Sequence, residues 1–183
     1  RINMTYDLLK RFGEDISYQT LEHAFKSVSK QINSDHAKGT DILFKQRLIE
    51  MLHNIDNDLP RRLSPIGISA IATIIDYSFI CIPPTLFKGT INALCTLSKL
   101  PVKIGLISNT GLTSPVGYRR WFQDLGILDF FHHITFSNGV ACAKPDKSIF
   151  ELTLKELDIR PENAIHIGDN LYSDIWGANQ VGM

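Results

Sequence analysis

Apolar residues recur with helical spacing through the first 80 residues of the chain. The clearest stripe follows Ser17, a residue type typical of a helix N-cap, and repeats at steps of four, three and four positions. It consists of Leu21, Phe25, Val28 and Ile32. Three further helices are predicted: one stopped by Gly13, one from Thr40 to about Ile55, and one opened by Ser64-Pro65. Together these segments predict a small all-helical bundle.

The pattern changes after Pro83-Pro84, where short apolar runs begin to alternate with helical segments. Strands are predicted at 102–107, 134–136 and 164–167, with helices at about 91–97, at 118–125 and from Pro145 onwards. Strands that alternate with helices at this spacing pair in parallel and are joined by crossover helices. The predicted fold class is therefore α/β, with a parallel sheet beside the helical bundle.

Composition and charge narrow the range of partners. The chain has 183 residues, 44% of them hydrophobic and 21% charged, which provides enough apolar mass for a core. The 19 basic and 19 acidic side chains cancel, so neither nucleic acid nor an anionic membrane is expected as a partner. The longest apolar stretch, 66–75, ends at Asp76 and is too short for a transmembrane span. The oligomeric state is left open.

The cysteine pattern favours a reducing environment. Three cysteines occur without the spacing of a zinc site or a disulfide framework: Cys81, Cys95 and Cys142. A cytoplasmic location is therefore expected.

Polar groups follow each predicted strand, at the edge where an open parallel sheet binds its ligands. The first strand ends in Ser108-Asn109-Thr110-Gly111, whose hydroxyl, amide and backbone N–H groups can donate hydrogen bonds to an anion. Lys144, before Pro145, adds a positive charge near the amino end of a predicted helix. The third strand ends in Gly168-Asp169, and Asp174 follows five positions after that acid. Two converging carboxylates need a cation between them, and Mg²⁺ prefers oxygen ligands.

Each of these features also has a purely structural interpretation. A capped turn would explain the residues after the first strand, a solvated loop would explain Lys144, and a helix cap would explain Asp169. His166, inside the third predicted strand, is expected to pack against a crossover helix. The order of the polar groups at three successive strand ends is what favours a site.

Taken in order, Ser108-Asn109, Lys144-Pro145 and residues 168–174 resemble motifs II, III and IV of the haloacid dehalogenase-like hydrolase superfamily. The resemblance is closest to the phosphatases of that family that carry an early helical cap, and it covers almost the whole chain. Residues 1–80 resemble the helical cap domain, and 81–183 resemble the Rossmann-like core. The resemblance implies a Mg²⁺-dependent phosphatase of a small phosphorylated metabolite that works through an aspartyl-phosphate intermediate.

The resemblance also implies a role for individual residues. Ser108 would hydrogen-bond the transferring phosphoryl group, and Asn109 would contact the phosphate or the leaving group. Lys144 would neutralise charge on the phosphate and on the nucleophile. Asp169 would ligate Mg²⁺, while Asp174 would ligate it directly or hold a metal-bound water. A cation, a lysine and fixed dipoles would then meet the charge on the phosphoryl oxygens.

One motif of the family is not found: the apolar strand ending in Asp-x-Asp that carries the nucleophile. Asp56-Asn57-Asp58 follows a helical stretch and precedes no glycine, so it is not identified as this motif. The nucleophile is expected upstream of Arg1, and the chain is expected to be truncated at both ends. Each backbone group left unpaired beside the absent central strand would cost about 1 to 3 kcal/mol. The chain alone is therefore expected to be poorly folded and inactive.

Two alternatives stay open. A 2-haloacid dehalogenase shares the aspartate nucleophile but needs no metal, and the acids Asp169 and Asp174 favour the metal-dependent enzyme. A non-catalytic module of the same family would bind a partner or ligand through its cap groove, without the first motif.

Overall fold

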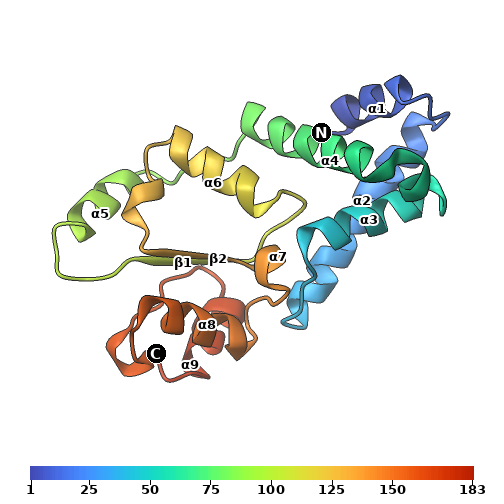
Figure 1. Ribbon diagram of the computed structural model, residues 1–183. Helices are drawn as coiled ribbons and strands as arrows, with labels where there is room; N and C mark the ends of the chain where they lie inside the picture. Colours follow the sequence, from blue (N-terminus) through green and yellow to red (C-terminus); the bar gives the residue numbers. More distant parts are fainter.

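The computed structural model describes all 183 residues, which fall into a helical part (residues 1–81) and a sheet part (82–183) (Figure 1). The helical part comprises α1 (Ile2–Arg11), α2 (Tyr18–Ala37), α3 (Phe44–Ile55) and α4 (Leu59–Cys81). The sheet part begins with α5 (Thr90–Leu97), β1 (Gly105–Ser108), α6 (Pro115–Asp124), the 3₁₀ turn η1 (Leu128–Phe130) and β2 (His133–Phe136). It continues with α7 (Ser137–Val140), α8 (Lys147–Leu157), the 3₁₀ turn η2 (Pro161–Asn163), the π-helical turn η3 (Leu171–Trp176) and α9 (Gly177–Asn179).

Local sequence signals explain where the longer helices begin. The Ser17 hydroxyl accepts a hydrogen bond from the backbone N–H of Thr20 (3.0 Å), which caps α2 as predicted. Ser64 has φ 60° and ψ 170°, so α4 breaks there and resumes at Pro65, where the sequence predicts a helix start. The apolar faces of these helices meet in one buried cluster. Its fully buried members include Leu21, Leu48, Met51, Leu52, Ile71 and Ile75.

The predicted start of the third helix at Thr40 is wrong. Residues 40–43 are not helical, and α3 begins at Phe44. The chain turns at Gly39 (φ 74°), and Thr40 then forms an antiparallel bridge with Cys142 of the sheet part. Asp41 follows and accepts a hydrogen bond from the Ile42 backbone N–H (2.8 Å). These contacts hold the segment in an extended form that delays the helix.

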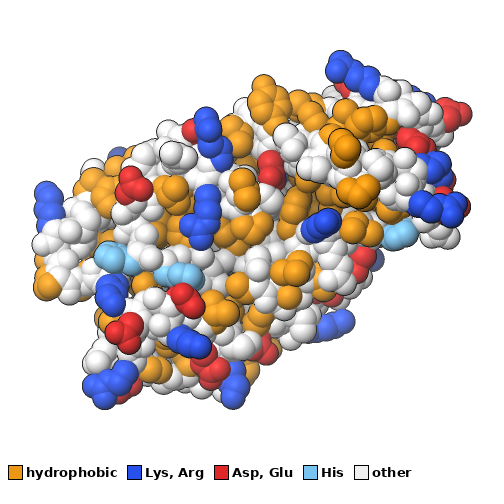
Figure 2. Space-filling view, viewed as in Figure 1, with side chains coloured by type: hydrophobic (Ala, Val, Ile, Leu, Met, Phe, Trp, Pro, Cys, Tyr) orange, Lys and Arg blue, Asp and Glu red, His pale blue; other side chains and the backbone are white.

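Helix α4 belongs to the helical part but packs against both parts of the molecule. It is long and apolar enough to cross a membrane by length and composition, and Figure 2 shows apolar side chains exposed over it. One such helix is weak evidence of a membrane protein, because core helices of water-soluble proteins pass the same test. Here Ile75 is buried in the cluster of the helical part and Phe79 in that of the sheet part. Asp76, its only acid, accepts hydrogen bonds from the backbone N–H (2.8 Å) and hydroxyl of Ser114, at the start of α6.

The sheet consists of two parallel strands covered on both faces. Gly105 of β1 is in register with His133 of β2, and Ser108 with Phe136. Alternate residues point to opposite faces of a strand. Leu106 accordingly packs in the cluster that contains α6, whereas Ile107 packs in the cluster that contains α8. The predicted α/β class, with parallel strands and crossover helices, is confirmed (Figure 1).

The third predicted strand, 164–167, is not a strand in this structure. Its backbone makes no ladder hydrogen bond, and Ile165 and Ile167 are 88% and 87% exposed. Strand hydrogen bonds require a neighbouring strand, and β1 and β2 pair only with each other. His166 points the other way, and its ring packs edge-on against Phe150 with 5.1 Å between ring centroids. The segment is therefore positioned by this side chain rather than by backbone pairing.

Candidate active site

Ser108 lies at the carboxyl end of β1, where the sequence predicts it. Its half-buried hydroxyl has one hydrogen-bond partner, the carbonyl oxygen of Asn109, at 3.4 Å. This distance is long for a hydroxyl hydrogen bond, for which 2.7 to 2.8 Å is typical. The hydroxyl is therefore available to a ligand at the strand end.

Lys144 reaches the same strand end from the loop between α7 and α8. Its ammonium donates hydrogen bonds to the backbone carbonyl of Ile107 (3.0 Å) and to Asp174 Oδ1 (2.5 Å). The lysine side chain is 12% exposed and that of Asp174 is 4% exposed, so the ion pair is buried. Because an ammonium has three donors, one N–H remains for an anion next to Ser108.

The Asp174 carboxylate is the centre of a second set of contacts. His166 Nε2 lies 3.1 Å from Oδ1, and the backbone N–H of Asn170 donates to Oδ2 at 3.0 Å. Burial raises the pKa of Asp174, but the hydrogen bonds from Lys144, His166 and Asn170 outweigh it. The pKa therefore lies below its ordinary value, and the carboxylate is ionised at neutral pH.

Two local features place this carboxylate. The Asn170 side chain accepts hydrogen bonds from the backbone N–H groups of Tyr172 (3.0 Å) and Ser173 (2.8 Å), which caps η3. A Cβ atom on Gly168 would lie 2.2 Å from Asp174 Cγ. Only glycine leaves room for the carboxylate there. This close approach is a physical reason for the glycine that precedes Asp169.

Asp169, the other predicted metal ligand, lies apart from these contacts. It is exposed and makes no side-chain hydrogen bond. No group of three acidic, histidine or cysteine side chains is placed to hold a metal ion. Mg²⁺ usually takes one or two carboxylates and completes its shell with water and substrate phosphate. The free carboxylate of Asp169 and the remaining acceptor capacity of Asp174 fit that donor set.

Asn109 is used differently from the predicted phosphate contact. Its Oδ1 accepts a hydrogen bond from the Lys144 backbone N–H (2.8 Å), and its Nδ2 donates to the Lys144 carbonyl (2.8 Å). The two residues are 35 positions apart in the chain. The amide of Asn109 therefore faces the backbone of Lys144.

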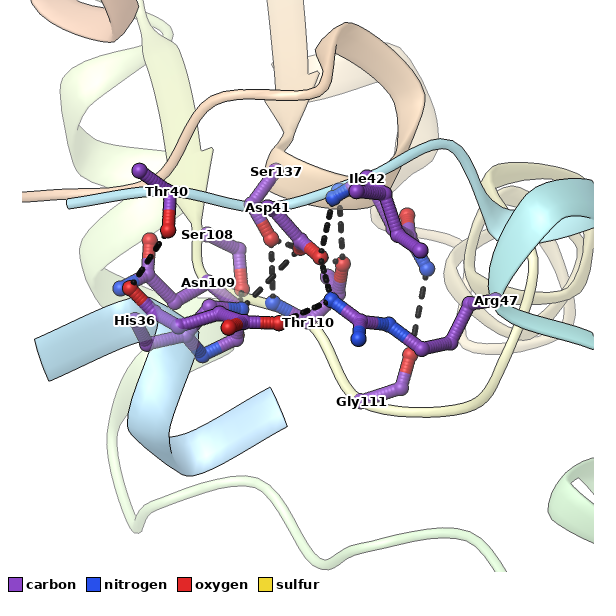
Figure 3. A network of polar contacts seen from close by, with 12 residues as sticks. His36, Thr40, Asp41, Ile42, Arg47, Ser108, Asn109, Thr110, Gly111 and Ser137 are labelled. Atoms are coloured by element: carbon purple, nitrogen blue, oxygen red, sulfur yellow. Dashed lines mark hydrogen bonds and ion pairs between the residues drawn. The ribbon is translucent and has the colours of Figure 1, made fainter. Parts of the chain in front are cut away.

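A buried polar network joins the helical part to this site (Figure 3). Arg47 of α3 donates to Asp35 (2.6 Å) and to Asp41 (3.1 Å), and His36 Nε2 lies 3.0 Å from Asp41 Oδ2. Burial raises the pKa of Asp41, but hydrogen bonds from its neighbours, first His36 and Ser137, outweigh it. The pKa of Asp41 therefore lies below its ordinary value.

In the sheet part, Ser137 and Asn138 hold the loop that follows β1. The backbone N–H of Thr110 donates to the Ser137 hydroxyl at 2.8 Å. The Asn138 side chain donates to the carbonyl oxygens of Gly111 (3.1 Å) and Thr113 (2.8 Å). The loop is thereby fixed from the carboxyl end of β2, as Figure 3 shows for Thr110 and Ser137.

Sequence reasoning did not assign His166, Asp41 or Ser137 to the site. The contact of His166 with Asp174 had a signal: His166 and Gly168 are two positions apart in an extended segment and so share a face. That is the face against which Asp174 packs. Asp41 and Ser137 carry no comparable signal, because their contacts join segments that are far apart in the sequence.

Comparisons with known proteins bear on the family and the fold of the chain. The family model described as haloacid dehalogenase-like hydrolase matches residues 6–182. A glyceraldehyde 3-phosphate phosphatase from Methanopyrus kandleri is 29% identical over 171 residues, which cover 92% of this chain and 66% of that protein. An enzyme of the same name from Pyrococcus furiosus is 37% identical over 95 residues, or 52% of this chain and 38% of its own length.

The solved structure of a HAD phosphatase from Thermococcus onnurineus supports the fold. It aligns with a TM-score of 0.60 and 21% identity, over 100% of this chain and 73% of that chain. The present chain thus spans less than two thirds of the length of the two phosphatases above. The family model, by contrast, matches nearly every residue of this chain. The chain belongs to the haloacid dehalogenase-like hydrolases.

Proposed function

We propose that the full-length protein is a Mg²⁺-dependent phosphatase of a small phosphorylated sugar. The observation that carries the proposal is the convergence of Ser108 and Lys144 at the carboxyl end of β1. The Ser108 hydroxyl has only one long contact (3.4 Å), and the Lys144 ammonium, with one free N–H, bonds to the carbonyl of Ile107, the residue before Ser108. Such a pair suits the terminal oxygens of a phosphate ester, which share its negative charge.

In this proposal, each residue stabilises the negative charge of the transferring phosphoryl group. Ser108 and Lys144 donate hydrogen bonds to its oxygens, whose charge grows in the transition state. Asp169 and Asp174 would hold Mg²⁺, which would supply further positive charge there. Asp174 also keeps the Lys144 ammonium in place through its buried ion pair.

The nucleophile of the proposed reaction is an aspartate that the family resemblance places upstream of Arg1. Its carboxylate attacks phosphorus and forms an acyl-phosphate bond while the bond to the leaving oxygen breaks and that oxygen takes up a proton. Water then hydrolyses the acyl phosphate and restores the carboxylate. Asp56-Asn57-Asp58 is not used, because Asp56 ends α3 and pairs with Arg62 on the surface.

The names of the relatives support the substrate class. Both sequence relatives are called glyceraldehyde 3-phosphate phosphatase, which favours phosphate transfer over the dehalogenase alternative. We propose a phosphorylated sugar of about this size as the substrate.

The test is phosphate release from glyceraldehyde 3-phosphate by the full-length protein, with Mg²⁺ and with EDTA. We expect turnover only with the metal, and a loss of about 10²- to 10³-fold in kcat for Ser108→Ala and for Lys144→Met. Lys155→Met, which removes an exposed lysine of α8, is the matched control. Turnover that survives EDTA and both variants would contradict the proposal. Chloride release from a 2-chloroacid would favour the dehalogenase, and phosphate binding without turnover would favour the binding module.

A cytoplasmic location is also part of the proposal. All three cysteines are free thiols in the structure, as is usual in a reducing compartment. Fractionation of cells that express the tagged protein tests this location.

A further inference from the structure

We propose that Asn109 is a positioning residue that acts through Lys144 rather than by contact with the substrate. The inference rests on the proposed phosphatase function, in which Lys144 meets the phosphoryl group. Its basis is the pair of 2.8 Å hydrogen bonds that joins the Asn109 amide to the backbone N–H and carbonyl of Lys144. One side chain thus holds both peptide groups of one residue.

The second anchor of Lys144 is at the other end of its side chain. The ammonium donates to the Ile107 carbonyl and to Asp174, so it is held by β1 and by η3. A lysine side chain is flexible, with four carbons between the backbone and the charge. The position of the third N–H is therefore defined only while both the backbone and the ammonium are held. Asn109 supplies the backbone half of that constraint.

The side-chain amide of Asn109 is already engaged in hydrogen bonds and is poorly placed to contact a phosphate. Its carbonyl oxygen and its nitrogen each make a short hydrogen bond to the same residue, which fixes the plane of the amide. The neighbouring hydroxyl of Ser108 has no comparable partner. The adjacent residues Ser108 and Asn109 therefore have different roles: Ser108 is available to bind the ligand, and Asn109 binds the backbone of Lys144.

Asn138 provides a matched control in the same region. It is buried, and its side-chain nitrogen makes two hydrogen bonds, to the carbonyls of Gly111 (3.1 Å) and Thr113 (2.8 Å). It stabilises the loop after β1 but makes no hydrogen bond to Lys144. Asn138→Ala therefore removes a similar amount of hydrogen bonding without touching the lysine.

The test is a double-mutant cycle on the full-length protein with glyceraldehyde 3-phosphate. Asn109→Ala and Asn138→Ala are made in the wild-type background and in Lys144→Met, and kcat and KM are measured for each. A displacement of about 1 Å can cost about 10²-fold in rate, so we expect Asn109→Ala to lose roughly ten- to a hundredfold in kcat. In Lys144→Met the same change should cost less than about twofold, while the effect of Asn138→Ala should be equal in both backgrounds.

The ammonium signal of Lys144 gives a readout that does not depend on turnover. In ¹⁵N-lysine NMR, an ammonium held by two acceptors gives a sharp signal, which Lys144→Met identifies. We expect Asn109→Ala to broaden or remove it and Asn138→Ala to leave it. Asn109→Asp, which keeps the acceptor but not the donor, should give an intermediate result and serves if the alanine variant does not fold.

The outcomes separate the two proposals. Absence of turnover by the wild-type protein would refute the phosphatase, whereas the NMR signal would still test Asn109. If Asn109→Ala costs the same factor with and without Lys144, Asn109 contacts the substrate directly and the inference is wrong. An unchanged ammonium signal in Asn109→Ala would overturn it as well.

Discussion

Replacing Gly168 with alanine tests the packing that places the Asp174 carboxylate. The new Cβ atom would lie 2.2 Å from Asp174 Cγ and 2.5 Å from its Oδ2, far inside van der Waals contact. The carboxylate cannot rotate away freely, because Lys144, His166 and the Asn170 backbone all donate hydrogen bonds to it. The variant must therefore break these bonds or move the backbone.

The expected cost follows from these contacts. Overpacking of a filled site typically costs about 1 to 3 kcal/mol. Displacement of the carboxylate also separates the buried pair with Lys144, and loss of one partner of such a pair costs about 3 to 5 kcal/mol. We expect Gly168→Ala to lower the free energy of unfolding by about 3 to 5 kcal/mol, a large share of the roughly 5 to 15 kcal/mol of a typical domain.

Urea unfolding of the full-length protein measures this loss, with Gly105→Ala as control. A Cβ atom on Gly105 would meet Leu157 Cδ1 at 2.7 Å, but this methyl group ends a flexible, half-buried side chain that can rotate. Alanine also suits a strand better than glycine by about 0.5 to 1 kcal/mol, so the control should be nearly neutral. In an Asp174→Gly background, which also removes the Asp174 Cβ atom that would lie 2.5 Å from the new one, the cost of Gly168→Ala should largely disappear. Equal losses for the two glycine variants, or an unchanged cost in that background, would refute the reasoning.

Two further predictions concern the buried charges. Arg47→Met should lower the free energy of unfolding by about 3 to 5 kcal/mol, because it leaves Asp35 and Asp41 without their shared cation. Urea unfolding measures this loss. Partial recovery of stability when Asp41→Asn is added would confirm the cause. The second concerns acid: the folded-state pKa values of Asp41 and Asp174 lie below the unfolded value of 3.8, so the unfolded chain binds protons first. The stabilisation that these two carboxylates contribute is complete above 3.8 and is lost as the pH falls below that value, through their folded-state pKa values. A urea midpoint that stays constant from pH 5 to pH 3 would contradict this.

Helix signals that act within a few residues could be predicted from the sequence. Ser17 caps α2 through the backbone of Thr20, and Ser64-Pro65 marks the break in α4. Both depend on neighbours in the chain, so the pattern contains the information. The false start at Thr40 shows the limit: its backbone bridges to Cys142, about a hundred residues later. No local pattern contains that contact.

The same distinction explains the third predicted strand. The side chains of this segment do face opposite ways in turn, but it is His166 that faces inward, whereas the apolar Ile165 and Ile167 face solvent. A strand, however, is defined by its neighbour, and no neighbouring strand lies along this segment. The apolar run therefore predicts neither the strand hydrogen bonds nor the exposure of the two isoleucines, because both depend on a neighbouring strand.

The candidate site could be located from the sequence but not resolved in detail. The rule that ligands bind at the carboxyl ends of parallel strands selects Ser108, and the structure brings Lys144 and Asp174 to the same place. The individual partners depend on loop geometry. The ion pair of Lys144 with Asp174 and the use of Asn109 by the Lys144 backbone become visible only once the loops are placed.

One turn of helix α4 links the two parts of the molecule. Ile75 and Phe79 are one helical turn apart, yet each belongs to a different hydrophobic cluster. Asp76, between them, holds the first turn of α6. Unfolding of this one turn would expose a buried residue of each cluster at once. We therefore expect the two parts to unfold together, and any rotation between them to move residues 75–79 of α4 with it.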